Sequence, residues 1–500
     1  QKVTMPSIFS KATFRKLLSG FPKLTGDILI YGIGGSLAQV VGLVTIPIIT
    51  RILTSSEYGS VDVITAAAAY FTVLITLNLG TGLMRFYYET TGNPECDRAQ
   101  MVSSLAWFTL LFGGLVAALV ALFAGSLSDL LFGSPVYGKA ITLAVASLPF
   151  AALKEIFKNV LRMQRKPVNF LAINILYALV NFALILLFVV SFKGGIDGYF
   201  WAQVISAVIA ALVSAWLCRA QLAFSFSKHW FWLMAAYSLP MVPGGLFTWG
   251  MTYVNRILLT QYTSASQIAY YSMATKAAKV IELVVTAFIL GWFPVFLKNI
   301  NSPTFHAKMD RVFRYYFYAT LSLSAVVTAF GREFFMVLAP PEYAPGVALV
   351  ALLCLKQVFY ASTYTYTVGI TQTRKTYFVS VSTGLGVLAT IGVSLLLLPA
   401  YGIFGAALAD LLGTFVYALL MLLFSERLVS LNLRYAPVVL SLLGFLLLWG
   451  VSVLVQLPNP WLDALLRAGL LAAYLVFVYA IIDRGTILKK LMAAVRQAAG

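Results

Sequence analysis

Four basic residues lie inside long apolar segments of the sequence, where a charge is costly. They are Arg256, Lys276, Lys279 and Lys356. Arg or Lys at the centre of a membrane costs at least ~2.5–3.5 kcal/mol on insertion scales, so such residues usually face a cavity or a partner. Because Arg and Lys bind phosphate through charge-assisted hydrogen bonds, these four residues indicate a site for an anionic group.

Aromatic residues share helix faces with these cations. The spacing is i, i+4, i+7 in one segment and i, i+4, i+8 in another: Trp249, Tyr253 and Arg256, then Lys356, Tyr360 and Tyr364. Residues at such spacings lie on one side of a helix. Cations can meet phosphates while rings stack on the apolar faces of sugars. The pattern therefore suits a ligand with phosphates at one end and sugars at the other.

Each of these residues also has a structural interpretation. Arg256 lies near enough to a helix end to extend to the membrane surface. Lys276 and Lys279 could be satisfied by Glu282 on the same stripe. Tyrosines at helical spacing are more often packing residues than ligand contacts. Lys356 is the hardest to explain this way, because it has no acidic neighbour at i±3 or i±4.

Two carboxylates are candidates for ion coupling. Asp410 lies a turn or two into an apolar segment, and Asp62 lies at the start of another. An intramembrane carboxylate can relay a proton or a cation. The alternative for Asp410 is a structural hydrogen bond, and the alternative for Asp62 is a position at the membrane interface. The only histidines, His229 and His306, lie in loops without metal-ligand spacing. We expect no metal and no cofactor, with H⁺ or Na⁺ as the coupling ion.

The composition requires that membrane helices position these residues. Hydrophobic residues make up 61% and charged residues 10% of 500 positions, and the mean hydropathy is +0.90. A soluble domain carries about 25% charged residues, and a spanning helix needs about 20 apolar ones. We therefore predict an all-α polytopic membrane protein with 14 helices. The predicted spans are 27–50, 61–84, 101–124, 139–161, 168–191, 197–218, 231–260, 267–297, 311–338, 344–371, 376–398, 403–425, 436–457 and 462–482.

The basic residues predict the orientation of these spans. Outside the spans, in the loops and the two terminal tails, 26 Lys and Arg residues fall on the face that carries both termini, and five fall on the opposite face. Positive residues collect on the cytoplasmic side, so both termini are predicted to be cytoplasmic. The net charge of +18 is thereby explained as a topology signal, and no nucleic-acid partner is needed.

The sequence also repeats itself. Three landmarks recur at displacements of 205, 209 and 207 residues: Arg51-Ile52-Leu53 at Arg256-Ile257-Leu258, Arg165-Lys166 at Arg374-Lys375, and Gly195-Ile196 at Gly402-Ile403. Their common spacing indicates a duplicated unit of six helices. An even number of spans gives both copies the same orientation, around a central cavity. The predicted parts are a tail (1–25), an N-lobe with six helices (26–225), a C-lobe with six (226–428), two additional helices (429–484) and a second tail (485–500).

Several segments resemble a known family. They are PIITRILTSSEYG from Pro47 to Gly59, the Leu79-Gly80 to Tyr87 segment, and the stretch from Ser238-Leu239-Pro240 through Asn255-Arg256 to Tyr270-Tyr271. Over roughly residues 25 to 425 the chain resembles the polysaccharide-transporter branch of the multidrug/oligosaccharidyl-lipid/polysaccharide (MOP) exporter superfamily. In particular, it resembles bacterial Wzx-like lipid-linked oligosaccharide flippases.

The resemblance implies a function in surface polysaccharide biosynthesis of the O-antigen or capsule type. The implied substrate is an undecaprenyl-diphosphate-linked oligosaccharide, which crosses from the cytoplasmic to the periplasmic leaflet of the bacterial inner membrane by alternating access. Membrane lipids and the glycan-assembly machinery are the implied partners. The implied diphosphate-binding residues are Arg51, Arg256, Lys276, Lys279 and Lys356; the implied glycan contacts are Trp249, Tyr253, Tyr360 and Tyr364.

The sequence departs from the family pattern in two ways. Asn255 stands where the family often has Asp, which argues against an ion-coupling or pairing role for that position. Fourteen helices are more typical of lipid II (peptidoglycan precursor) flippases, which leaves the substrate open. A multidrug exporter of the same superfamily is disfavoured because the intramembrane charges are mostly basic. A membrane glycan polymerase or ligase is disfavoured because the sequence contains no long loop for a catalytic site. We therefore predict a transporter and not an enzyme.

Overall fold

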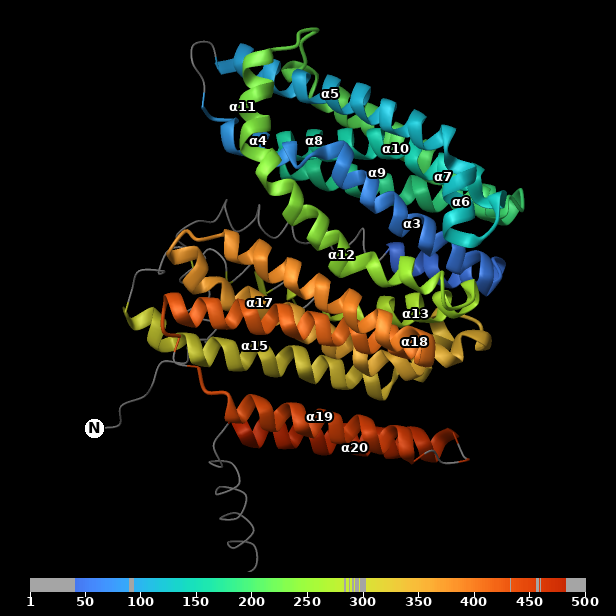
Figure 1. The fold of residues 1–500 in the computed structure, drawn as a ribbon, viewed down its shortest axis with the longest axis vertical. Coiled ribbons are helices and arrows are strands. Elements are labelled where there is room, and N and C mark those ends of the chain that lie inside the picture. Colours follow the sequence, from blue (N-terminus) through green and yellow to red (C-terminus); the bar gives the residue numbers. More distant parts are fainter. Residues whose placement is uncertain are drawn as a thin grey trace, which may run out of the picture.

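The computed structural model describes residues 41–89, 94–282, 285–286, 288–289, 292, 296, 303–431, 433–455, 458 and 460–482. All regular elements among these residues are helices (Figure 1). The predicted all-α fold class is therefore confirmed for this part of the chain.

The predicted N-lobe forms one group of packed helices, at the top of Figure 1. After a short helix at Val41–Ile52, its α-helices are α3 (Ser55–Thr76), α4 (Leu79–Phe86), α5 (Pro94–Leu122), α6 (Ala124–Phe132), α7 (Gly138–Ala146), α8 (Leu148–Met163), α9 (Pro167–Ile185) and α10 (Gly195–Leu217). A π-helical segment, Leu186–Ser191, extends α9.

The predicted C-lobe lies below the N-lobe in Figure 1, and the two additional helices lie below the C-lobe. The C-lobe elements are α11 (Lys228–Ser238), α12 (Val242–Leu259), α13 (Ala265–Ala278), α15 (Pro303–Ala329), α16 (Gly331–Leu338), the 3₁₀ segment Pro341–Leu349, α17 (Val350–Gln372) and α18 (Tyr377–Leu428). The additional helices are α19 (Ala436–Leu454) and α20 (Pro460–Ile482), and both pack against α15. Helix α11 packs against α4 and α5 of the N-lobe, whereas α12 crosses to the C-lobe.

The spans agree with the prediction in most of the described chain. Nine described helices are long and apolar enough to cross a membrane, and the bent pair α15 and α16, which turns by 67°, makes a tenth. Helix α18 holds two predicted spans, 376–398 and 403–425, which meet at a kink at Gly402. The predicted 231–260 span is divided into α11 and α12. The spans 27–50 and 267–297 lie partly outside the described residues, so the number of 14 stays a prediction.

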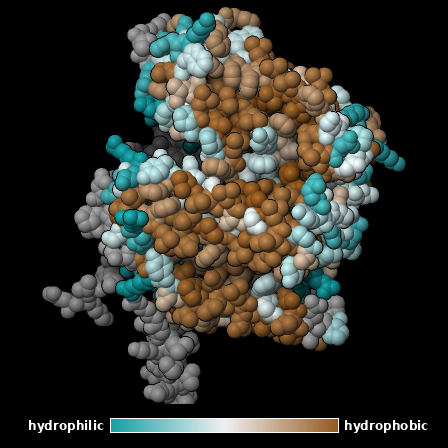
Figure 2. All heavy atoms as spheres, in the orientation of Figure 1, coloured by the Kyte–Doolittle hydropathy of each residue, from teal (hydrophilic) through white to brown (hydrophobic). Residues whose placement is uncertain are grey.

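The surface has the pattern of a membrane protein. Figure 2 shows hydrophobic side chains over the middle of the molecule, with hydrophilic side chains gathered toward the two ends of the helices. Large apolar side chains project outward from this band, including Leu388 on α18 and Leu447 on α19. On a soluble protein an apolar surface of this extent would be unusual, so the band is the surface that faces lipid.

The internal repeat is visible in the backbone. Arg165 and Arg374 both adopt the left-handed conformation, with φ of 54° and 59°, where one span ends and the next begins. Gly195 and Gly402 do the same, with φ of 54° and 50°. In each half a long helix is followed by a short one, α6 or α16, and then by a 3₁₀ turn. Equivalent positions of the repeated sequence therefore have equivalent backbone conformations.

Helix α3 differs from the predicted 61–84 span at both ends. It begins at Ser55 because Thr54 and Glu57 form a capping box: the Glu57 carboxylate accepts from the Thr54 N–H at 2.9 Å, and the Thr54 hydroxyl accepts from the Glu57 N–H. It ends at Thr76 because Leu77 and Asn78 take left-handed conformations, with φ of 44° and 55°. The chain then resumes as α4, so the apolar run contains a break.

The two lobes meet at the end of the helices where α3 begins and α12 ends. The charge-based topology predicts this end to be periplasmic, and we refer to it as the outer end. Helix α3 packs against both α12 and α13. At the closest approach, a Cβ atom on Gly59 would lie 1.8 Å from the carbonyl oxygen of Ala265, so only glycine fits. Thr50 also donates to the Leu338 carbonyl of α16 at 2.8 Å.

Candidate functional site

An ion pair joins the two lobes near the outer end. Arg256 on α12 donates to the Asp62 carboxylate on α3 and to the Thr252 carbonyl oxygen at 2.7 Å. The Arg256 side chain is 6% exposed and the Asp62 side chain 14%. Arg256 therefore does not extend to the membrane surface. Breaking a buried pair by removing one partner typically costs about 3–5 kcal/mol, because the other charge stays buried and uncompensated.

Lys276 on α13 lies beside this pair. Its ammonium hydrogen-bonds the Tyr58 hydroxyl on α3 and sits 4.3 Å from the centre of the Tyr58 ring. Asp62 attracts Lys276 as well as Arg256. One carboxylate of the N-lobe thus faces two cations of the C-lobe. Positive charge therefore exceeds negative charge at this contact between the lobes.

A second buried pair lies within the C-lobe. The Lys356 ammonium on α17 is 2.8 Å from the Asp410 carboxylate on α18. Asp410 also accepts from the Asn255 amide at 2.9 Å and from the Tyr271 hydroxyl. Four helices, α12, α13, α17 and α18, therefore supply one connected network. The partner of Lys356 is not on its own helix, which is why helical spacing could not reveal it.

These residues form a layer whose carboxylates lie about two turns inside the outer end. Asp62 is seven residues beyond Ser55, and Asp410 is eight residues beyond Gly402. At 1.5 Å per residue, both lie about 10–12 Å inside the helix ends. We call the set of Asp62, Arg256, Lys276, Lys356 and Asp410 the outer charged layer. The structure thus brings three predicted phosphate-binding cations together with both predicted ion-coupling carboxylates.

Two predicted phosphate-binding residues lie apart from this layer. Arg51 is exposed and donates to the carbonyl oxygens of Met336 and Val337, at 3.3 and 3.2 Å, which ties the N-lobe to the end of α16. Lys279 is exposed and caps the end of α13. Arg51 is therefore an outer contact between the lobes, and the predicted ligand role of Lys279 stays a prediction.

The predicted glycan contacts fall into two groups. Trp249 donates through its indole N–H to the Ala66 carbonyl of α3 at 2.9 Å, and Tyr253 lies under the Arg256 guanidinium at 5.3 Å. Trp249 therefore belongs to the contact between the lobes, whereas Tyr253 contacts Arg256 on its own helix. Tyr360 and Tyr364 contact each other within the C-lobe, with ring centres 6.1 Å apart, and Tyr364 is 37% exposed.

Sequence reasoning missed three members of the network. Tyr58 and Tyr271 hydrogen-bond Lys276 and Asp410, and Asn255 joins Asp410 to α12. Asn255 and Tyr271 were visible only as parts of family-like segments. No spacing within one helix signals such partners, because each lies on a different helix from the charge it contacts.

The family follows from comparison with known proteins. A family model described as polysaccharide biosynthesis protein matches residues 24–300, which is more than half of the chain. The chain belongs to this family. Among curated proteins, none matches the sequence significantly.

Solved structures share the fold. The lipid II flippase MurJ, in an inward closed conformation, superposes with a TM-score of 0.70 at 15% identity, covering 92% of this chain and 100% of MurJ. An inward-facing multidrug resistance MATE family transporter of the MOP superfamily gives a TM-score of 0.59 at 14% identity, covering 79% of this chain and 98% of its own. The Vibrio cholerae MATE transporter VcmN in its bent form gives a TM-score of 0.51 at 15% identity, covering 84% of this chain and 98% of the VcmN chain.

Together, these findings confirm three predictions. The protein is a member of the MOP exporter superfamily, of the polysaccharide-transporter type. It has the all-helical fold of MurJ and the MATE transporters. It is a multi-pass membrane exporter and not an enzyme, since its family consists of transporters.

Proposed function

We propose that this protein exports an undecaprenyl-diphosphate-linked oligosaccharide from the cytoplasmic to the periplasmic leaflet of the bacterial inner membrane, for surface polysaccharide biosynthesis. The observation that carries the proposal is the outer charged layer. That layer contains three cations and two carboxylates. Asp62, Arg256 and Lys276 lie at the contact between the lobes, and Lys356 and Asp410 lie within the C-lobe. Such a layer favours an anionic headgroup and disfavours a cationic drug.

The layer also supplies a way to couple substrate to lobe movement. The contact between Asp62 and Arg256 holds the outer end closed, because it joins α3 to α12. A diphosphate that reaches Lys276 and Arg256 competes with Asp62 for the same donors. Since Arg binds phosphate oxygens in the geometry it uses for carboxylate, this exchange separates the lobes at their outer end. The substrate would thereby stabilise the state that releases it.

The carboxylates are the proposed point of ion coupling. Asp62 freed from Arg256, or Asp410 freed from Lys356, would be an unpaired buried acid. Such a group takes up a proton or a Na⁺ ion, because a buried charge without a partner is costly. An H⁺ or Na⁺ bound there would complete the separation of the charges. Return of the ion to the cytoplasm would let the original pairs form again.

A second candidate substrate is a peptidoglycan precursor. It is favoured by the likeness to the lipid II flippase MurJ, which extends over 92% of this chain. Both substrates carry a polyprenyl diphosphate, so the outer charged layer serves either one. The glycan distinguishes them, and the lipid that accumulates when the protein is absent is the direct measure.

A charge-neutralisation series tests the role of the layer. We expect Arg256→Ala combined with Lys356→Ala to abolish export of surface glycan at normal protein levels. The matched control is Arg332→Ala, which removes an exposed Arg at the outer end outside the layer. Unchanged surface glycan in the double variant would contradict the diphosphate role. Loss of glycan in the control as well would point to a nonspecific effect of charge.

A further inference from the structure

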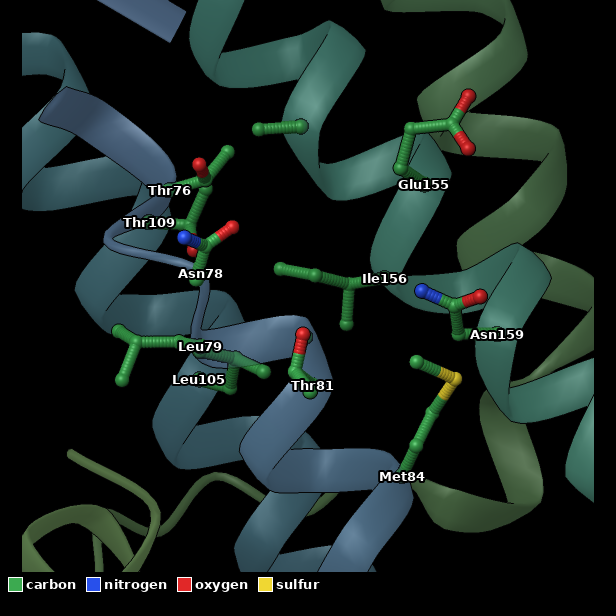
Figure 3. Close-up of a pocket in the computed structure, with 12 residues that line it drawn as sticks. Thr76, Asn78, Leu79, Thr81, Met84, Leu105, Thr109, Glu155, Ile156 and Asn159 are labelled. Atoms are coloured by element: carbon green, nitrogen blue, oxygen red, sulfur yellow. The ribbon is translucent and has the colours of Figure 1, made fainter. Parts of the chain in front are cut away.

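A second polar site lies in the inner half of the N-lobe, at the break between α3 and α4. A pocket of about 180 Å³ opens there between α3, α4, α5 and α8 (Figure 3). Its lining includes the apolar side chains of Leu79, Met84, Leu105 and Ile156. Interleaved with them are side chains that can hydrogen-bond: Thr76, Asn78, Thr81, Thr109, Glu155 and Asn159. Neither the function proposed above nor the outer charged layer uses any of these residues.

Three of these polar side chains can offer a hydroxyl or an amide group to a ligand. They are Thr81, Thr109 and Asn159. Thr109 is buried, at 1% exposed, whereas Thr81 and Asn159 are half-buried. In Figure 3, Asn78, Thr81 and Asn159 project toward the same space from three different segments. Together, these side chains line the pocket with groups that can donate and accept hydrogen bonds.

The pocket is open to water and not to lipid. The Glu155 side chain is 55% exposed although it lies eight residues before the end of α8 at Met163. That spacing places it about 12 Å inside the helix end, where a carboxylate facing hydrocarbon would be strongly disfavoured. The pocket is also adjacent to the C-lobe, because the Asn78 amide donates to the Met241 carbonyl at 3.1 Å.

The charges around the pocket argue against a bare ion as its ligand. Glu155 is the only charged residue in the lining, and its carboxylate already accepts from Lys158 at 3.0 Å and lies 3.4 Å from Lys154. Two ammonium groups therefore share one carboxylate, which leaves no negative charge for a cation. Neither lysine lines the pocket, so a phosphate would find no cation there. A neutral ligand with hydroxyl groups fits the donors and acceptors.

We infer that this pocket binds one sugar unit of the glycan while the substrate is loaded from the cytoplasmic side. A sugar ring presents hydroxyl groups at its edge and an apolar face, which matches a lining that combines hydrogen-bonding and apolar side chains. The volume equals that of about six water molecules at ≈30 Å³ each, enough for one ring but not for a chain. The inference rests on the proposed function, because it takes the substrate to carry a glycan.

The position of the pocket adds a length requirement. Thr76 is 14 residues along α3 from Asp62, which corresponds to about 21 Å at 1.5 Å per residue. A substrate with its diphosphate at the outer charged layer and a sugar in the pocket must span that distance. A lipid with several linked sugars can therefore occupy both sites at once, whereas a lipid with a single sugar cannot.

Protection from chemical labelling tests the inference. The purified full-length protein carries Met84→Cys in a Cys96→Ser background, because Cys96 is the exposed cysteine and Cys218 and Cys354 are buried. Maleimide labelling at position 84 is measured with polyprenyl-diphosphate-linked oligosaccharide extracted from the native host, and with polyprenyl diphosphate alone. We expect the glycan-bearing lipid to slow labelling and the bare diphosphate to leave it unchanged. A cysteine at Lys193, an exposed residue outside the pocket, is the control position and should stay unprotected.

The outcomes separate the pocket from the proposed function. If the added glycan-bearing lipid does not bind the wild-type protein, the proposed function fails. If glycan-bearing lipid binds but labelling at position 84 stays fast, the pocket assignment fails while the function stands. If Na⁺ alone slows labelling, the pocket is a cation site and the sugar assignment is wrong.

Substitutions that keep the protein folded provide an independent check. Thr81→Val and Asn159→Ala should each weaken protection about three- to tenfold, the effect of one lost hydrogen bond. Thr142→Val is the matched control, because the Thr142 hydroxyl donates within its own helix to Gly138 at 2.9 Å, away from the pocket. Equal protection in all three variants would overturn the assignment.

Discussion

Removing Asp62 should open the outer end of the protein. In Asp62→Ala, the Arg256 guanidinium keeps its buried position, 6% exposed, but loses its carboxylate, and Lys276 lies beside it. Two buried cations then face each other across the contact between the lobes. Loss of one partner of a buried pair typically costs about 3–5 kcal/mol, so the outer-closed state should lose a factor of roughly 150 to 5,000 in its equilibrium constant.

A cysteine at Ser266 reports this change. The Ser266 hydroxyl contacts the Ser55 hydroxyl across the lobes at 3.2 Å and is partly buried by this contact, so a reagent reaches position 266 more readily when the lobes separate. In a Cys96→Ser background, labelling by a membrane-impermeant maleimide should be much faster in Asp62→Ala than with Asp62 intact. Adding Arg256→Ala should restore slow labelling, because it removes the uncompensated charge.

Two results would refute this reasoning. Equal labelling with and without Asp62, at equal protein levels, would mean that the pair does not hold the lobes together. Fast labelling that Arg256→Ala fails to restore would mean that Asp62 acts through some group other than Arg256. Position 193, which is exposed, should be labelled equally in all variants and controls for reagent access.

Three further predictions concern stability and closure. Lys356→Ala should lower the melting temperature more than Lys356→Ala combined with Asp410→Asn, since the single change leaves a buried carboxylate unpaired; a less stable double variant would contradict this. Gly59→Val should speed maleimide labelling of the cysteine at position 266, because a side chain at position 59 cannot fit against Ala265. Gly114→Val is the control, since open space surrounds Gly114, and should leave the labelling rate unchanged. Equal labelling rates in the two variants would show that the close packing at Gly59 is dispensable. Arg467→Ala should release α20 from α16 and increase protease cleavage near α20, because Arg467 joins Glu333 at 2.7 Å and Asp463 at 3.0 Å; unchanged cleavage would exclude that link.

The fold could be predicted where one segment carries the whole signal. Apolar runs located most spans, and the repeat of Arg165 and Gly195 at Arg374 and Gly402 anticipated matching left-handed residues. The start of α3 was missed although its signal was present, since Thr54 and Glu57 have capping-box spacing. The break at Leu77 could not be found, because hydropathy averages over a window and is insensitive to backbone angles.

The site could be predicted residue by residue but not as a network. The free-energy cost of placing a charge inside the membrane identified Arg256 and Lys356 as candidate site residues. Their partners, Asp62 and Asp410, are 194 and 54 residues away, so only the folded chain brings them together. The same limit applies to the inner pocket, whose polar groups come from helices far apart in the sequence. Spacing within α8 relates Asn159 to Glu155, but not to Thr109 on α5 or to Asn78 before α4.

The most direct test of the central claim is to deplete the protein in its native host and measure the polyprenyl-diphosphate lipids. We expect one glycan-loaded lipid to accumulate on the cytoplasmic side while the matching surface polysaccharide is lost, with both reversed when the wild-type protein is restored. The glycan on that lipid identifies the substrate, whether a surface oligosaccharide or a peptidoglycan precursor. A lipid pool and a cell surface that stay unchanged after depletion would contradict the account.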